Sequence, residues 1–339
     1  MAGDTIAMAV IGAGRIGKIH AENLAYRIPR ARLLSVADAN FAAARELAGS
    51  FDACRSTGDY RAVLDRADID AVVIATPATT HVEIIIEAAR AGKHIFCEKP
   101  IDFDLQRIDR ALAAALQSEV KFQVGFNRRF DPDFCRLRKW LDEGRIGETH
   151  VLRITSRDPQ PPPISYISTS GGLFLDMAIH DFDLARFLLQ DEVASLTATG
   201  SVLIDPAIEA LGDVDTAVTT LKFKHGAIAT IDNSRRAAYG YDQRVELFGS
   251  GGMAFCGNLP GHTCVINDAR GSHAAKAGST QFGRYEAAYR RELEAFVECA
   301  LEGKPPAATG QDGRQATLLG LAAKCSCVEG RTVSLDQFS

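Results

Sequence analysis

Residues 6–17 read Ile-Ala-Met-Ala-Val-Ile-Gly-Ala-Gly-Arg-Ile-Gly, in which a short apolar run, Ile6–Ile11, is followed by the spacing G-x-G-x-x-G. An apolar run of this length predicts a buried strand, and the pattern that follows it, as far as Pro29, is helical. A second apolar run, Ala31–Ala37, ends in Asp38, about 20 residues beyond the last glycine. The glycines alone would also suit an ordinary turn. Strand, glycine turn, helix and acid together predict a dinucleotide-binding βαβ unit.

Asp38 indicates which dinucleotide this unit binds. A carboxylate at this position accepts hydrogen bonds from the ribose hydroxyls and repels a 2′-phosphate. The next two residues, Ala39 and Asn40, carry no guanidinium that would offset the repulsion. The sequence therefore predicts NAD rather than NADP, with the pyrophosphate at the N-terminus of the first helix.

The alternation of strands and helices continues to residue 125. Apolar runs predict further strands at residues 70–76, 94–97 and 121–125, and helical patterns lie between them at residues 79–91 and 104–117. Strands that are apolar on both faces and alternate with helices are typical of a doubly wound parallel sheet. We therefore expect residues 1–126 to form a Rossmann-type domain.

Two polar segments lie at the carboxyl ends of these predicted strands, where ligands bind in such sheets. They are Thr76-Pro77 and Glu98-Lys99-Pro100. A lysine at the end of a strand is also compatible with simple solvation, so position alone does not assign it a role.

Beyond residue 126 the pattern favours antiparallel strands. The runs that indicate them are residues 150–154, 217–223 and 228–231, with a tight turn at Lys224-His225-Gly226. Helices are predicted at residues 133–143, 285–301 and 313–329, and four prolines at 158–163 predict a loop. We expect residues 127–339 to form an α+β domain built on a large, open, mostly antiparallel sheet.

A buried helix predicted over Gly171–Leu188 carries titratable side chains. Asp176, His180 and Asp183 fall at i, i+4 and i+7 and so share one helix face. Buried titratable groups are costly unless they pair, and they cluster where proton transfer takes place. The segment alone favours a core Asp–His pair that satisfies itself. The dinucleotide unit that precedes it favours a catalytic pair.

Composition excludes several other classes of protein. The 339 residues are 46% hydrophobic and 24% charged, with a net charge of −5, which argues against a nucleic-acid partner. No apolar run approaches the roughly 18 residues of a membrane span, and Met1–Ile11 lacks a secretory signal, so we expect a cytoplasmic protein. The eight cysteines form no Cys-x-x-Cys pair. They predict small buried side chains and no bound metal.

Three motifs, in this order, resemble the Gfo/Idh/MocA oxidoreductases: the glycine fingerprint, Glu98-Lys99-Pro100 and Asp176-x-x-x-His180. The resemblance runs from Ile6 to Leu335. Within the family it is greatest to the inositol 2-dehydrogenases, through residues 125–131, 156–159, 171–188 and 233–242. Close relatives often carry Arg and Thr where this chain has Leu175 and Ala178, which leaves the preferred cyclitol or sugar open.

The resemblance implies the site residues and the assembly. The catalytic set is Lys99, Asp176 and His180, with the nicotinamide beside Lys99-Pro100, and the assembly is a homotetramer formed through the open sheets. The cofactor contacts are Gly12, Gly14, Arg15, Ile16, Gly17, Asp38, Thr76, Pro77, His81, Glu98, Lys99 and Asn127. The substrate contacts are Lys99, Asn127, Arg129, Asp158, Asp176, His180 and Tyr241. Apart from the resemblance, His20 and His81 are interpreted as packing or cofactor-adjacent residues rather than catalytic ones. Tyr285, at a predicted helix start, is interpreted as a packing residue, with a place in the pocket lining as the alternative.

The chemistry of these residue types agrees with alcohol oxidation. His180 suits the base, because the reference pKa of imidazole is about 6.5 and that of lysine about 10.4. Protonated Lys99 would stabilise the developing alkoxide, and Asp176 would orient the imidazole or accept from a substrate hydroxyl. Which of Lys99 and His180 first takes the proton stays open. We expect Asp158 and Asp176 to offset the charge of Arg129, which favours a neutral ring polyol over a hydroxy acid.

The leading hypothesis is NAD-dependent oxidation of myo-inositol to 2-keto-myo-inositol, with scyllo-inositol as a possible second substrate. One alternative is a dehydrogenase of an aldopyranose or another polyol. The other is a non-catalytic sensor that binds NAD and a sugar, against which the complete set of Lys99, Asp176 and His180 argues.

Overall fold

The structure, a computed structural model, describes residues 5–278 and 280–338 and divides into two compact units. The first comprises the chain as far as Phe130 together with Ala287–Thr317, and the second comprises Asp131–Glu286 and Leu318–Ser339. The sequence analysis placed the late segment Ala287–Thr317 in the second domain. It belongs to the first unit because Leu293, Phe296 and Val297 are buried in that unit's hydrophobic core. Residues 1–4, part of the stretch considered for a secretory signal, lie outside the described residues.

The first unit is built on a six-stranded sheet in the order β3-β2-β1-β4-β5-β6, and every pairing is parallel. The strands are β1 (Ile6–Ile11), β2 (Ala31–Ala37), β3 (Arg55–Thr57), β4 (Ala71–Ile74), β5 (His94–Glu98) and β6 (Phe122–Gly125). All residues of β1 and β4 are buried, as expected for strands covered on both faces. This confirms the Rossmann-type sheet. The strand order reverses between β1 and β4, where such sheets bind dinucleotides.

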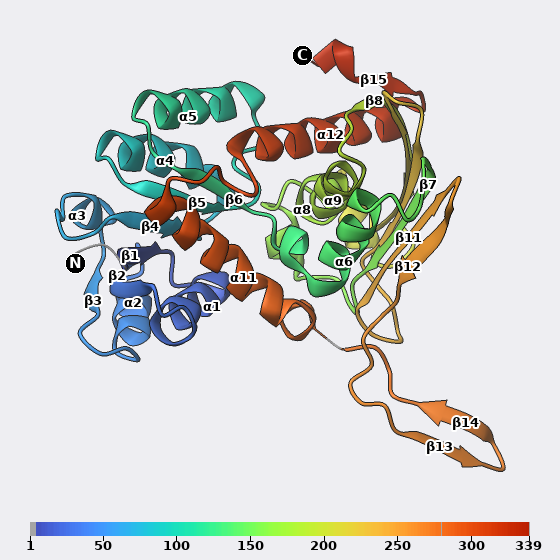
Figure 1. Ribbon diagram of the computed structural model, residues 1–339, viewed down its shortest axis with the longest axis horizontal. Helices are drawn as coiled ribbons and strands as arrows, with labels where there is room; N and C mark the ends of the chain where they lie inside the picture. Colours follow the sequence, from blue (N-terminus) through green and yellow to red (C-terminus); the bar gives the residue numbers. More distant parts are fainter. Residues whose placement is uncertain (1–4, 279, 339) are drawn as a thin grey trace. The chain divides into compact units, whose positions relative to one another are not determined.

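Helices follow the strands of this sheet along the chain (Figure 1). Asp104 caps α5 by accepting hydrogen bonds from the backbone amides of Gln106 and Arg107. The helical elements here are α1 (Arg15–Glu22), η1 (Asn23–Arg27), α2 (Phe41–Ala48), α3 (Arg61–Leu64), η2 (Ala78–Thr80), α4 (His81–Arg90), α5 (Leu105–Gln117) and η3 (Asn127–Phe130). Parts of α11 (Gln281–Glu302) and α12 (Gly310–Glu329) also belong to this unit.

The second unit is built on a seven-stranded sheet in the order β12-β11-β7-β10-β9-β8-β15. Only β7 and β10 pair in parallel, so the predicted open, mostly antiparallel sheet is confirmed. Its strands are β7 (Thr149–Arg157), β8 (Val193–Ser201), β9 (Thr216–Phe223), β10 (Ile228–Ser234), β11 (Asp242–Gly249), β12 (Gly252–Cys256) and β15 (Val333–Ser334).

One face of this sheet is covered by helices and the other is open (Figure 1). In β9, Leu221 and Phe223 are buried while Val218, Thr220 and Lys222 on the opposite face are exposed. The helices are α6 (Pro132–Asp142), α7 (Ile164–Ile167), α8 (Leu173–Asp176), α9 (Ile179–Leu189) and α10 (Pro206–Glu209), and the chain ends in η4 (Leu335–Phe338). The alternation produces an apolar core on one side and a solvent-facing surface on the other.

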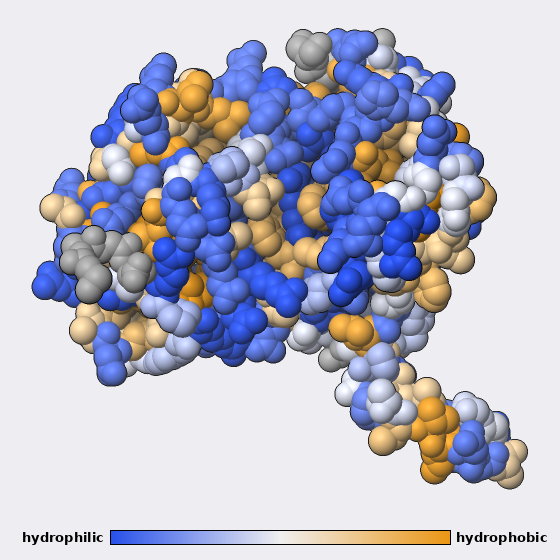
Figure 2. Space-filling model, in the orientation of Figure 1, coloured by the Kyte–Doolittle hydropathy of each residue, from blue (hydrophilic) through white to orange (hydrophobic). Residues whose placement is uncertain are grey.

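A two-stranded hairpin, β13 (Val265–Asp268) and β14 (Gly271–Ala274), extends away from the seven-stranded sheet. Val265 and Ile266 are exposed on it, and Figure 2 shows an apolar patch on this arm. The sequence analysis did not predict this hairpin.

The single helix predicted over Gly171–Leu188 is wrong in one respect, because the structure has two short helices, α8 and α9. The amide of Ala178 bonds to the carbonyl of Leu173, five residues back, and the amide of His180 bonds to Met177, three residues back. The regular i to i−4 ladder is therefore broken between Asp176 and His180. These two residues stand at the end of one helix and the start of the next, so the one-face argument from i, i+4 spacing does not apply to them.

Candidate functional site

The glycine turn after β1 is shaped by close backbone approach. Gly12 has φ +110°, and a Cβ there would fall on the carbonyl oxygen of Ala75 at the end of β4. A Cβ on Gly17 would fall on the carbonyl oxygen of Gly12, so this glycine lets α1 pack against the turn. A Cβ on Gly14 would meet nothing within 4 Å, so the space at the N-terminus of α1 is open.

The N-terminus of α1 is suited to an anion. Gly14 is its N-cap, no side chain caps it, and its first turn has no acidic residue. The backbone amides of a first helical turn lack intrahelical acceptors, and the helix dipole favours negative charge there. An open, uncapped helix start beside three glycines fits the pyrophosphate of a dinucleotide.

Asp38 is held at the end of β2. Its carboxylate accepts hydrogen bonds from the backbone amides of Ala13, at 2.7 Å, and Asn40, at 2.8 Å. Each carboxylate oxygen has a second lone pair, so Asp38 can still accept from ribose hydroxyls. Tying Asp38 to the glycine turn fixes the carboxylate relative to the phosphate site, which fits NAD.

The first prediction concerns Asp38. The catalytic efficiency with NAD should exceed that with NADP by at least about tenfold, since one phosphate–carboxylate repulsion is worth roughly 1.4 kcal/mol or more. Asp38→Ala should narrow this ratio, and Asp52→Ala, which removes an exposed acid of the same unit, should leave it unchanged. Initial rates with both cofactors measure the ratio. Equal rates with NAD and NADP in the unaltered protein would contradict the assignment.

His81 lies between the ends of two strands. It is 1% exposed, its Nδ1 lies 2.8 Å from the carbonyl oxygen of Pro100, and its Nε2 lies 2.8 Å from that of Thr76. Burial lowers the pKa of His81, which favours the neutral ring with one N–H donor. A neutral ring donates to only one of these two carbonyls, so His81 is tied to the backbone at either Thr76 or Pro100, the residue after Lys99.

Lys99 lies between two anchored neighbours at the end of β5. The carboxylate of Glu98 lies 2.7 Å from Nε2 of His20, while the carbonyl of Pro100 faces His81. Both histidines are fully or almost fully buried, so these interactions are shielded from solvent. The backbone that carries Lys99 thus has a buried histidine on either side.

Asn127 and Arg129 lie in η3, directly after β6. Asn127 is 2% exposed, and its Oδ1 has no hydrogen-bond partner among the described residues, as expected for an acceptor facing a ligand. Arg129 lies 3.0 Å from Asp312 and donates to the carbonyl of Ala307. The carboxylate that offsets the charge of Arg129 in this unit is therefore Asp312, whereas the sequence analysis expected Asp158 and Asp176. Arg129 and Asp312 are too far apart in the sequence for any local pattern to predict that they pair.

In the second unit, Asp176 lies in a network that the sequence did not indicate. It accepts a hydrogen bond from the hydroxyl of Tyr166 at 2.9 Å and lies 3.5 Å from Nη1 of Arg235. The side chain of Arg235 is 1% exposed and also lies 3.9 Å from Asp213, which accepts from the amide of Leu173. The buried guanidinium of Arg235 thus lies between Asp176, at the end of α8, and Asp213, which binds the first residue of α8.

The second prediction is that Arg235→Met lowers the free energy of unfolding by about 3–5 kcal/mol. The substitution removes the guanidinium that lies beside the carboxylates of Asp176 and Asp213 and leaves both without this counter-charge. Arg236→Met is the matched control, since Arg236 is exposed and should change stability by less than about 0.5 kcal/mol. Urea unfolding followed by circular dichroism measures both. Equal unfolding midpoints for the two variants would contradict the structural role of Arg235.

Of the titratable residues on α8 and α9, Asp176 and His180 are only partly buried, while Asp181 and Asp183 are in the core. Asp181 is anchored by the side-chain amide of Asn233 at 2.8 Å. Asp176 and His180 therefore keep access to a ligand that their neighbours lack. Asp183 is 1% exposed, which favours a structural role for it.

The remaining predicted contacts also lie in this unit. Asp158 is half-buried at the end of β7, where its backbone bonds to Ser234 and Ala237. Tyr241 is 7% exposed, and its ring lies edge-on to Tyr285 at 6.1 Å. The hydroxyl of Tyr285 donates to Gln243 at 3.1 Å, which agrees with its interpretation as a packing residue.

Leu175 and Ala178, which flank Asp176, are both core residues. A Cβ on Gly320 would meet the side chain of Leu175 at 2.6 Å, so Leu175 packs closely on α12. Any influence of these two positions on substrate preference would therefore act through the placement of Asp176.

The Rossmann-type sheet, with its glycine turn and Asp38, defines an NAD-binding oxidoreductase. Residues 6–126 match the model of the oxidoreductase family with an NAD-binding Rossmann fold, and residues 134–255 match the GFO/IDH/MocA C-terminal domain. The chain belongs to the Gfo/Idh/MocA family of oxidoreductases. No helix in the described part of the chain is long and apolar enough to cross a membrane.

Similar proteins cover almost the whole chain. It is 46% identical to myo-inositol 2-dehydrogenase of Thermotoga maritima, over 97% of this chain and 98% of the relative. It is 47% identical to inositol 2-dehydrogenase of Rhizobium meliloti, over 98% and 99%. Among solved structures, a probable dehydrogenase from Thermotoga maritima superposes with a TM-score of 0.96 at 45% identity, covering 98% and 99%. Scyllo-inositol dehydrogenase from Lactobacillus casei, with bound NAD(H) and scyllo-inositol, superposes at 0.90 with 30% identity, covering 98% and 99%.

Proposed function

We propose that this protein oxidises the hydroxyl at C2 of myo-inositol with NAD, giving 2-keto-myo-inositol and NADH, and that scyllo-inositol is a second substrate. The observation that carries the proposal is the near full-length identity of 46% and 47% to two inositol 2-dehydrogenases. The presence of Lys99, Asp176 and His180 together supports catalysis rather than binding alone.

In the proposed reaction a secondary alcohol loses a hydride from carbon and a proton from oxygen. NAD, when bound, accepts the hydride. His180 takes the hydroxyl proton, directly or after Lys99, because a neutral imidazole is a good base near neutral pH. In the direct route the ammonium of Lys99 stabilises the negative charge that develops on the oxygen, and in the relay Lys99 starts as a neutral amine and takes the proton itself. Asp176, fixed by Tyr166 and Arg235, accepts a hydrogen bond from the substrate or orients the imidazole.

The proposed substrate is a neutral polyol, because the predicted contacts are side chains that donate or accept hydrogen bonds. A ring with a hydroxyl on every carbon can satisfy such groups, and an apolar ligand would leave them buried and unpaired. Asp312 already pairs with Arg129, so Arg129 needs no carboxylate on the substrate. This favours a cyclitol over a hydroxy acid.

Initial rates of NADH formation over a panel of substrates test the proposal. Myo-inositol should give the highest catalytic efficiency, with scyllo-inositol and pyranoses of matching hydroxyl pattern below it. The product from myo-inositol should be the 2-ketone by NMR. Reduction of NAD with simple aldoses but with no inositol isomer would replace this proposal with the aldose alternative.

We also propose that the protein is a cytoplasmic homotetramer that assembles through the open face of the seven-stranded sheet. The register aligns Met253, Phe248, Val151 and Ile228 in one row across this face. Met253 and Phe248 are 56% and 47% exposed, and Phe255 beside them is 67% exposed. An apolar row of this kind on an uncovered sheet supports association with a second copy. The eight free cysteines are compatible with a reducing compartment.

The third prediction tests this assembly. Phe255→Glu should shift the tetramer to smaller species, because a charge buried in an apolar interface remains unpaired. Leu203→Glu is the control, since Leu203 is 74% exposed and lies outside the sheet. Sedimentation velocity distinguishes the species. A monomeric unaltered protein, or a Phe255→Glu variant that sediments as the unaltered protein does, would contradict the proposal.

A further inference from the structure

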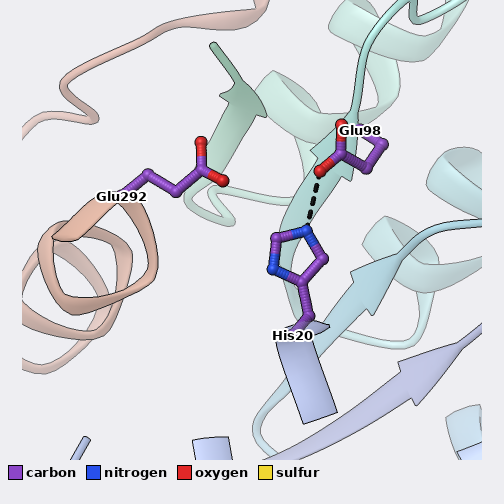
Figure 3. Close-up of side chains that lie close together, drawn as sticks. All are labelled: His20, Glu98 and Glu292. Atoms are coloured by element: carbon purple, nitrogen blue, oxygen red, sulfur yellow. Dashed lines mark hydrogen bonds and ion pairs between the residues drawn. The ribbon is translucent and has the colours of Figure 1, made fainter. Parts of the chain in front are cut away.

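A cluster of three titratable side chains lies inside the first unit, and neither the fold nor the proposed reaction accounts for it. His20 comes from α1, Glu98 from the end of β5 and Glu292 from α11, and one ligand atom of each lies within 4.8 Å of the other two. Figure 3 shows the carboxylate of Glu292 directed toward the other two side chains. The exposed fractions of the three residues are 0%, 9% and 0%.

The pairing inside the cluster is incomplete. Nε2 of His20 lies 2.7 Å from the carboxylate of Glu98. Both carboxylate oxygens of Glu292, and Nδ1 of His20, have no hydrogen-bond partner among the described residues. The ring of His20 is enclosed by Phe96 and Tyr289, so no other charged group approaches it from those sides. An ionised carboxylate in this position would be buried without a hydrogen-bond donor among the described residues, which is unfavourable.

Two occupants would remove that cost, a metal ion or a proton. Two ligands of one zinc ion, each about 2.0–2.1 Å from it, lie about 3.3 Å apart in a tetrahedral site. His20 and Glu98 are closer than this, at 2.7 Å, which is a hydrogen-bond distance with the proton between them. The geometry thus favours a proton over a metal. Burial and the nearby charge of Glu98 both raise the pKa of Glu292 well above its usual value.

We propose that Glu292 is a protonated carboxylic acid that completes, with His20 and Glu98, a buried clamp that positions Lys99. In this arrangement Nε2 of His20 is hydrogen-bonded to the carboxyl group of Glu98, and the proton on Glu292 removes a second carboxylate charge from the cluster. The O–H of Glu292 bonds to neither group in the structure, although one of its oxygens lies within 4.8 Å of ligand atoms of both, so it would donate to Glu98 or to Nδ1 of His20 only after a shift of the side chain. Glu98, the member of the cluster bonded to His20, is the residue directly before Lys99.

The clamp has a mechanical basis in the packing around Glu98. A Cβ on Gly125, the residue opposite Glu98 in β6, would lie 3.1 Å from its carboxyl carbon, so the glycine lets the Glu98 carboxyl group pack closely against β6. The backbone of Glu292 is itself held, since its carbonyl accepts from the side-chain amide of Gln123 at 2.8 Å. With His81 beside Pro100 on the other side, the cluster fixes the segment from which the Lys99 side chain extends.

Infrared spectroscopy tests the protonation. The unaltered protein at pH 8 should show a C=O stretch of a protonated carboxylic acid, and Glu292→Gln should lose it while Lys99→Met keeps it. Elemental analysis should find less than about 0.1 equivalent of bound metal. A missing band with Glu292 intact, or one equivalent of metal removed by a chelator, would overturn the proposal. This readout does not depend on activity.

Kinetics test the positioning role, which rests on the proposed function of Lys99. Glu292→Met keeps the volume but removes the donor, so kcat should fall roughly tenfold or more, since small displacements of a catalytic group are costly. The KM for NAD should change by less than about threefold, and Glu292→Gln, which keeps a donor, should restore most of kcat. Unchanged kcat in a folded Glu292→Met protein would overturn the clamp. Full activity in Lys99→Met would overturn the role of Lys99 instead and leave the protonation result standing.

Discussion

Replacing His180 by Asn is expected to lower kcat by roughly 10²–10⁴-fold, the range for a general base in a proton-transfer step. Asn keeps a polar side chain of similar shape but cannot take a proton. Since His180 belongs to the second unit and the glycine turn to the first, NAD binding measured by fluorescence titration should stay within about threefold of normal. Stopped-flow turnover and the titration together separate loss of chemistry from loss of binding.

His225→Asn is the matched control for this variant. His225 is an exposed residue in the turn between β9 and β10, and its loss should leave kcat unchanged. Near-normal turnover in His180→Asn would move the base role to Lys99 and make the Asp176–His180 arrangement structural.

The second large effect is expected at Lys99. Lys99→Met should also lose roughly 10²–10⁴-fold in kcat, because it removes the cation that stabilises the alkoxide. Lys99→Arg keeps the charge but cannot exchange a proton near neutral pH. Partial recovery in Lys99→Arg would mean that Lys99 acts through its charge, and no recovery would mean that it also carries the proton.

The double variant Lys99→Met, His180→Asn gives the sharpest form of this prediction. Groups that serve one transition state act as a unit. The kcat of the double variant should therefore be only slightly below that of the less active single variant. Lys139→Met, at an exposed lysine of α6, is the control for the loss of a positive charge. Fully multiplicative losses would contradict a shared transition state.

Much of the first unit was predictable because its signals are local. The apolar runs of β1 and β2 have the bounds Ile6–Ile11 and Ala31–Ala37 in both the prediction and the structure. Short elements without an apolar run, such as β3, were missed. The assignment of Ala287–Thr317 to the first unit could not be predicted, since it depends on long-range packing of α11 in the first core.

The site shows the same division between local and long-range information. The glycine turn and Asp38 are a contiguous pattern, and the structure gives each glycine a steric reason. The partners that fix the other residues come from distant segments: Arg235 for Asp176, Asp312 for Arg129 and His20 for Glu98. The break between α8 and α9 was hidden because the apolar pattern runs through it. The periodicity of apolar residues indicates which positions are buried, and this pattern does not change where the backbone hydrogen bonding of a helix is interrupted.

The central claim is that hydride passes from C2 of myo-inositol to NAD. Incubation with myo-inositol that carries deuterium at C2 tests it most directly, with the reduced cofactor analysed by mass spectrometry and NMR. The account predicts one deuterium at C4 of the nicotinamide, and roughly a hundredfold or more less labelled NADH in a His180→Asn sample incubated for the same time. NADH that forms without deuterium, or no NADH from any inositol isomer, would contradict it.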